Sequence, residues 1–152
     1  MQKYSSEWWA SLTPHQVGNE VETLVERVFK KWNNSVRFAW HRLPDMKAAR
    51  LNAISAQPAD YIYRCGKRAG FIEVKGVAHP YRLPKANLSQ LPTLHKWELA
   101  GSDDVVLVYH YLTNEWRAID PRLLKDGVPS HDLREFPVFG SADEALKSMG
   151  YF

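Results

Sequence analysis

The sequence predicts an α/β fold in which helices flank a central mixed β-sheet, and three segments carry this prediction. An apolar stripe with helical spacing runs through residues 11–33. Two strand-like runs, 59–65 and 70–76, flank a short basic turn with a glycine at each side, as in a β-hairpin. Residues 103–112 form a largely apolar run, which is typical of a central strand covered on both faces. The predicted order is helix, three strands, helix and two strands.

The first predicted helix is amphipathic because its apolar residues recur at spacings of three and four. They are Val21, Leu24, Val25, Val28, Phe29 and Trp32. The start of this helix has two candidates, a capping box at Thr13–Gln16 and a second one at Asn19–Glu22. Gly18 lies between them and would mark a break if the second box opens the helix.

The other elements follow from alternation, turn residues and capping residues. They are a strand at 35–43, a loop or short helix at 44–58, the hairpin at 59–76, a connector at 78–87, a helix at 89–101 capped by Ser89, the strand at 103–112, a turn at Thr113–Asn114, a strand at 115–120, an irregular stretch, and a short helix opened by Ser141. No repeat interrupts this order. We therefore expect a single domain over 1–152, with a core at about 18–120 and an irregular segment plus short helix at 121–152.

The composition is that of a globular protein and excludes two broad classes. Cys65 is the sole cysteine, so no intramolecular disulfide can form, which suits a reducing compartment. No apolar run approaches the ~20 residues that a membrane helix requires, and the first residues lack the apolar core of a signal peptide. We expect a soluble cytoplasmic protein of a bacterial cell, encoded by the host, a phage or a plasmid.

Charge is distributed unevenly along the chain. The formal net charge is only +3. Between residues 60 and 100, however, there are seven basic residues and only three acidic ones. A basic surface around a small acidic cluster suits a polyanion together with a divalent cation, although an ordinary solvated surface has the same pattern.

The acidic cluster comes from the hairpin. Side chains alternate across a strand, so Glu73 and Lys75 point to the same face and Val74 points to the other. Asp60 opens the partner strand, which folds back alongside. Two carboxylates, and the backbone carbonyl of Val74, are hard oxygen ligands of the kind that Mg²⁺ takes. Such a metal would activate water against a phosphodiester, and Lys75 would neutralise charge in the transition state.

Other interpretations have less support. A surface salt bridge between Glu73 and Lys75 is the plain alternative, but the apolar flank of Phe71, Ile72 and Val74 indicates a half-buried strand. The six histidines show no zinc-ligand spacing. A nucleophile elbow and a glycine-rich phosphate loop are both missing from the sequence, so we expect no small-molecule cofactor.

Asp60, followed thirteen residues later by Glu73-Val74-Lys75, resembles the PD-(D/E)XK nuclease superfamily. Within it, the pattern is most similar to RecU-like Holliday junction resolvases, whose first helix carries Gly-x-x-x-Glu, here Gly18 and Glu22. The resemblance spans roughly residues 18–120. It implies a restriction-endonuclease-like core, with Asp60 and Glu73 as metal ligands and Lys75 as the catalytic lysine.

The resemblance also implies roles for two further residues. Glu22 would be an acid that approaches the metal from the first helix, and its position at the edge of the apolar stripe lets it lean inward. Gln90, near the start of the second long helix, would help to hold a water or a phosphate. Plain alternatives are a solvated glutamate for Glu22 and helix capping for Gln90.

The chain departs from the family pattern in two places. Ala59 separates Pro58 from Asp60, and the segment 43–57, which projects into the junction in RecU-like enzymes, is short here. Basic residues before and after the site are the candidate phosphate contacts, each with a solvated side chain as its alternative. They are Arg42, Lys47, Arg50, Arg82 and Lys85.

The resemblance implies a Mg²⁺-dependent endonuclease, with Mn²⁺ as a substitute, that resolves four-way DNA junctions. Symmetric cleavage of two strands requires two sites related by a two-fold axis, so a homodimer is expected. Two alternatives stay open. One is a PD-(D/E)XK nuclease acting on a different DNA structure in restriction, repair or recombination, and the other is a non-catalytic DNA-binding subunit with this fold.

Overall fold

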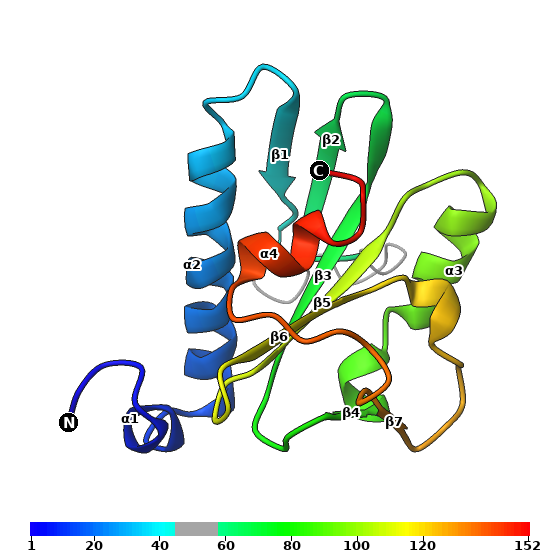
Figure 1. Cartoon of the computed structure of the whole chain (residues 1–152). Helices are drawn as coiled ribbons and strands as arrows, with labels where there is room; N and C mark the ends of the chain where they lie inside the picture. The colour runs from blue at the N-terminus through cyan, green and yellow to red at the C-terminus, as the bar shows by residue number, and fades with distance from the viewer. Residues whose placement is uncertain (45–57) are drawn as a thin grey trace.

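A computed structural model of the chain, which describes residues 1–44 and 58–152, contains a five-stranded sheet with helices on both faces (Figure 1). The strands are β1 (Phe38–Arg42), β2 (Tyr61–Cys65), β3 (Arg68–Val77), β5 (Val105–His110) and β6 (Glu115–Ile119). Their order across the sheet is β1-β2-β3-β5-β6. β3 and β5 are parallel and every other neighbouring pair is antiparallel. The predicted mixed sheet is therefore confirmed, including the hairpin and the central strand β5.

Helix α2 (Pro14–Trp32) covers one face of the sheet together with the short helix α4 (Ala142–Lys147) (Figure 1). The Thr13 box opens α2: the backbone N–H of Gln16 donates to the Thr13 hydroxyl and the Thr13 N–H donates to the Gln16 side chain. Gly18 lies within the helix and does not break it. The predicted apolar stripe is buried against the sheet at Val21, Val25 and Phe29.

The opposite face is covered by α3 (Leu91–Leu99), the 3₁₀ helices η1 (Lys85–Leu88) and η2 (Pro121–Leu123), and a small sheet of β4 (Arg82–Pro84) and β7 (Ser130–Asp132). Two predictions are wrong here. The stretch 78–87 is more than a connector, because buried Leu83 and Leu88 anchor β4 and η1 to the core. Ser89 does not cap α3; its hydroxyl donates to the side chain of Gln90, which is the N-cap residue.

A short helix that sequence patterns did not indicate, α1 (Ser6–Ala10), precedes α2. Trp9 anchors it, because its ring is 1% exposed and stacks on Tyr111 at a centroid distance of 5.0 Å. Among the residues that the structure describes, no helix combines the length and apolar character needed to cross a bilayer.

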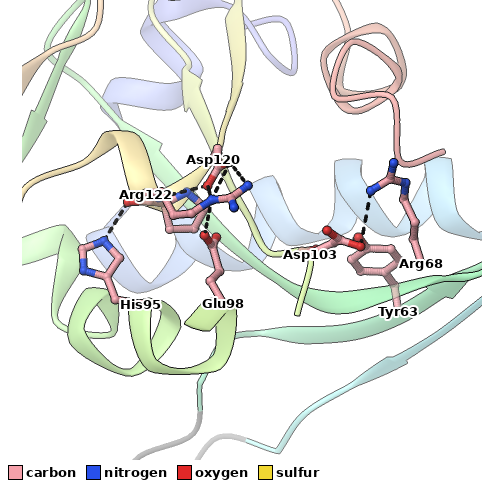
Figure 2. Close-up of polar contacts among 8 residues, drawn as sticks. Tyr63, Arg68, His95, Glu98, Asp103, Asp120 and Arg122 are labelled. Carbon is pink, nitrogen blue, oxygen red and sulfur yellow. Dashed lines mark hydrogen bonds and ion pairs between the residues drawn. The ribbon is translucent and has the colours of Figure 1, made fainter. Parts of the chain in front are cut away.

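Polar contacts fasten the loop between α3 and β5 to its surroundings (Figure 2). The Tyr63 hydroxyl donates to the carbonyl of Asp103 at 2.6 Å, and Arg68 pairs with the Asp103 carboxylate at 3.5 Å. On the other side of the view, Arg122 lies 2.9 Å from the buried carboxylate of Glu98. The Tyr63 contact, together with a hydrogen bond of 2.9 Å from the Asp103 N–H to the Ala69 carbonyl, fixes the position of the Asp103 backbone against β3.

This fixed backbone makes Gly70→Ala strongly destabilising. A Cβ at Gly70 would lie 2.1 Å from the carbonyl oxygen of Asp103, a distance at which one of the two backbones must move. We expect the free energy of unfolding of Gly70→Ala, measured by urea denaturation, to be about 3 kcal/mol lower than that of the wild type. Gly18→Ala is the matched control: a Cβ there meets no described atom within 4 Å, so it should stabilise helix α2 by up to about 1 kcal/mol. Equal stabilities for the two variants would contradict this account.

Candidate active site

Strand β3 positions Glu73 and Lys75 on the face of the sheet that α3 and η1 cover. Val106 and Val108 of β5 lie beside them on this face. Asp60 lies one residue before β2, directly beyond the paired positions Tyr61 and Ile72. Its carboxylate accepts a hydrogen bond of 2.8 Å from the backbone N–H of Val74. The hairpin therefore brings Asp60, Glu73 and Lys75 together, as the alternation of the strand predicted.

Glu73 is a buried carboxylate with little to stabilise its charge. It is 1% exposed, and the ammonium of Lys75 lies 2.9 Å from Oε1 as an ion pair. Within the described part of the chain, neither Glu73 oxygen accepts a well-formed hydrogen bond. Burial, and next the charge of Asp60, raise the pKa of Glu73 to about 8 against the opposing effect of Lys75.

Glu22 approaches the same cluster from α2. Burial, and then the charge of Asp60, raise its pKa to about 7, and Arg42 acts in the opposite direction. The Arg42 guanidinium donates to Glu22 and, at 3.1 Å, to Glu26, which also accepts a hydrogen bond from the Tyr61 hydroxyl. Arg42 thus ties β1 to α2 and holds Glu22 in place. The sequence predicts a phosphate contact for Arg42 and carries no signal for this bridge to Glu22 and Glu26.

A cleft of about 370 Å³ lies beside the cluster and is lined by Glu22, Asp60 and Lys75 among others. Gly76 lets α2 approach β3 closely here, because a Cβ at that position would lie 2.8 Å from the side chain of Val21. Asn87 of η1 also lines the cleft. It was missed because nothing in the sequence indicated that η1 folds back over the end of β3.

The donor set fits a divalent cation. Asp60 and Glu73 offer carboxylate oxygens, Val74 offers a backbone carbonyl nearby, and neither Glu73 oxygen accepts a well-formed hydrogen bond from the described residues. Across residues 1–44 and 58–152, no three His, Cys, Asp or Glu side chains form a ready metal cage. Mg²⁺ does not need one, because it keeps several waters and takes only one or two carboxylates. The residues present therefore suit Mg²⁺ better than zinc.

The other predicted residues lie farther from the cluster or outside the described residues. Gln90 occupies the N-cap position of α3 without a side-chain capping bond among the described residues, and it is not part of the cleft lining. Arg82 donates to the Ser130 hydroxyl at 3.2 Å, and Lys85 is exposed at the start of η1. Lys47 and Arg50 lie outside the described residues. Their roles stay predictions.

Comparisons with known proteins give one informative result. Neither a family model nor a curated protein matches the chain. Among solved structures, the chain is similar to Hjc, a Holliday junction resolvase from Archaeoglobus fulgidus, with a TM-score of 0.51 over 84% of this chain and 98% of that one. Sequence identity is 18%, so this likeness concerns the fold. The chain shares the fold of this resolvase, a central mixed sheet flanked by helices.

This core of sheet and helices explains why the candidate residues meet where they do. In this core the hairpin β2–β3 supplies Asp60, Glu73 and Lys75, and α2 supplies Glu22 from the adjacent layer. The predicted fold class is confirmed. The more specific likeness to RecU-like enzymes rests on the sequence pattern, since the neighbour found is archaeal Hjc.

Proposed function

We propose that the protein is a Mg²⁺-dependent endonuclease that resolves four-way DNA junctions as a homodimer. The observation that carries this proposal is the buried carboxylate of Glu73, which has Asp60 and Lys75 as its neighbours and no well-formed hydrogen bond from the described residues. A buried carboxylate of this kind is unfavourable for folding. Such groups are found mainly at functional sites, and this one lies close to an open cleft.

The chain's own residues would divide the work as follows. Asp60, Glu73 and the carbonyl of Val74 would hold Mg²⁺, or Mn²⁺ in its place, and Glu22 would take part through water. When bound, this ion lowers the pKa of a coordinated water and polarises a phosphoryl oxygen. Lys75 donates toward the phosphate or the attacking water, and Asn87 is placed in the same cleft to orient either one.

Junction DNA is the favoured substrate for two reasons. The Gly18, Glu22, Asp60 and Glu73-x-Lys75 pattern is similar to RecU-like resolvases, and the structural neighbour Hjc is itself a Holliday junction resolvase. Two paired cuts require two active sites, which is why the proposal includes a dimer. Arg82 and Lys85 lie after the catalytic strand and would contact phosphates of the cleaved strand.

The test uses a synthetic four-way junction with one labelled arm. In Mg²⁺, the wild type should produce paired symmetric nicks, whereas Asp60→Asn should bind the junction and cut it at least about 10³-fold more slowly. Native gels measure binding and denaturing gels measure cutting. Equal cutting of linear duplex, flap or single strand would retain the nuclease and reject the junction. Binding without cutting in both Mg²⁺ and Mn²⁺ would support a non-catalytic DNA-binding subunit instead.

A further inference from the structure

A second pocket, of about 490 Å³, lies on the other side of η1 from the cleft. Its apolar surface comes mainly from Leu88, Leu91, Pro92 and Val128. Leu88 and Leu91 are also anchored in the apolar core of this face, so the floor of the pocket is rigid. An apolar recess of this size is large enough for a planar ring system the size of a nucleobase.

Polar groups that favour an anion surround this apolar floor. Lys85 and Lys125 are exposed and belong to the pocket lining, where they outnumber one carboxylate, that of Asp126. The α3 helix begins at Leu91 in the same lining, and its N-cap residue Gln90 makes no side-chain capping bond among residues 1–44 and 58–152. Pro92 has no N–H, so the N–H groups of Leu91 and Thr93 are the ones at this helix start that would attract a phosphate.

His131 belongs to the pocket lining and holds the loop that carries Lys125. Its Nε2 accepts a hydrogen bond of 2.9 Å from the backbone N–H of Lys125. The proton of the neutral ring must therefore be on Nδ1. This Nδ1 is shielded from solvent and has no hydrogen-bond partner in the described part of the chain. Because this Nδ1 is shielded by protein, a ligand in the pocket does not reach it, and the part of His131 is to fix the position of Lys125 in the wall.

The pocket and the cleft share a wall. η1 contributes Asn87 to the cleft, while its neighbours Ala86 and Leu88 line the pocket. Lys85, at the start of the same turn, stands at the pocket side of this wall. A DNA strand whose scissile phosphate sits at Lys75 and Asn87 would reach the pocket by passing over this single helical turn.

We infer that the pocket receives one unstacked nucleotide of the substrate strand, close to the bond that is cleaved. Its base would lie on the floor made by Leu88, Leu91 and Val128, and its phosphate would face Lys85 and Lys125. This inference rests on the proposed nuclease function and adds the class of DNA feature that is recognised. Bases at a branch point have already lost a stacking neighbour, so they are the least costly ones to extrude.

The test places 2-aminopurine, whose fluorescence rises on unstacking, at successive positions of a four-way junction. The junction is bound by the Asp60→Asn protein so that no cutting occurs. One position near the cleavage site should brighten severalfold on binding. Ala86→Trp in the same background fills the mouth of the pocket and should return this signal to the level of the free junction. Lys125→Ala, on an exposed loop, should lower it without affecting folding.

Lys30→Ala is the matched control, because Lys30 is an exposed lysine in the last turn of α2, outside both lining sets. It should leave the brightening unchanged. Junction binding without brightening at any position, or brightening that persists in both Ala86→Trp and Lys125→Ala, would overturn the pocket assignment alone. Failure of the Asp60→Asn protein and of the wild type to bind any DNA would overturn both this inference and the proposed function.

Discussion

Replacing Glu73 with glutamine is expected to abolish DNA cleavage and, at the same time, to stabilise the folded protein. Cleavage should fall by about 10³-fold or more, because an amide cannot supply the anionic oxygen that a divalent ion requires at this position. The fold should gain stability because Glu73 is 1% exposed and its charge has only the Lys75 ion pair to oppose burial. Lys75 is itself partly exposed, so it keeps water contact when the pair is lost.

The stability gain should depend on pH in a defined direction. The pKa of Glu73 is about 8 in the folded protein and 4.5 for the free side chain. Between these values the folded state binds more protons than the unfolded state, so wild-type stability falls as the pH rises from 4.5 to 8. Glu73→Gln removes this dependence. The two proteins should therefore have similar stability below pH 4.5, and the variant should be the more stable one above pH 8.

Thermal denaturation at pH 5 and pH 8.5, each with and without Mg²⁺, checks both parts of this prediction. At pH 8.5 the variant should melt several degrees higher than the metal-free wild type. Mg²⁺ should raise the melting temperature of the wild type and leave that of the variant unchanged, because a ligand that binds only the folded state stabilises it. A variant that is less stable than the wild type at pH 8.5 would show that the Glu73–Lys75 pair is structural.

The candidate cluster of Asp60, Glu73 and Lys75 was predictable from sequence because local rules bring its residues together. The two-residue period of a strand puts Glu73 and Lys75 on one face, and the short basic turn at residues 66–70 returns the chain so that Asp60 lies beside them. No knowledge of distant residues is required for either step. The same locality explains the correct placement of the apolar face of α2.

Features that depend on contacts between distant segments were not predictable in this way. Asn87 enters the cleft only because buried Leu83 and Leu88 hold β4 and η1 against the sheet. The Arg42 bridge to Glu22 and Glu26 joins a strand to a helix sixteen to twenty residues away, and its sequence signal is an ordinary surface arginine. Elements of three or four residues have little propensity of their own, so tertiary packing decides whether they form.

Lys75→Met separates the two tasks that the geometry gives to this lysine. Methionine keeps the unbranched stem and removes the charge. We expect the cleavage rate at saturating Mg²⁺ to fall by about 10³-fold, the effect of losing one positioned donor to a developing negative charge. The pKa of Glu73 should also rise further, because Lys75 is the group that lowers it, and this should weaken Mg²⁺ binding at neutral pH.

Single-turnover cleavage of the junction, measured against Mg²⁺ concentration at pH 7 and pH 9, distinguishes these effects. Metal binding should become tighter from pH 7 to pH 9, because a larger fraction of Glu73 is ionised at the higher pH, whereas the loss in maximal rate should persist at both pH values. Lys30→Met, in an exposed position on α2, is the control and should behave as the wild type. A maximal rate that recovers fully at pH 9 and high Mg²⁺ would show that the role of Lys75 is to keep Glu73 ionised and nothing more. A rate that stays low would assign the lysine to the phosphate or the attacking water, because only contact with the reacting groups is independent of how well the metal is held.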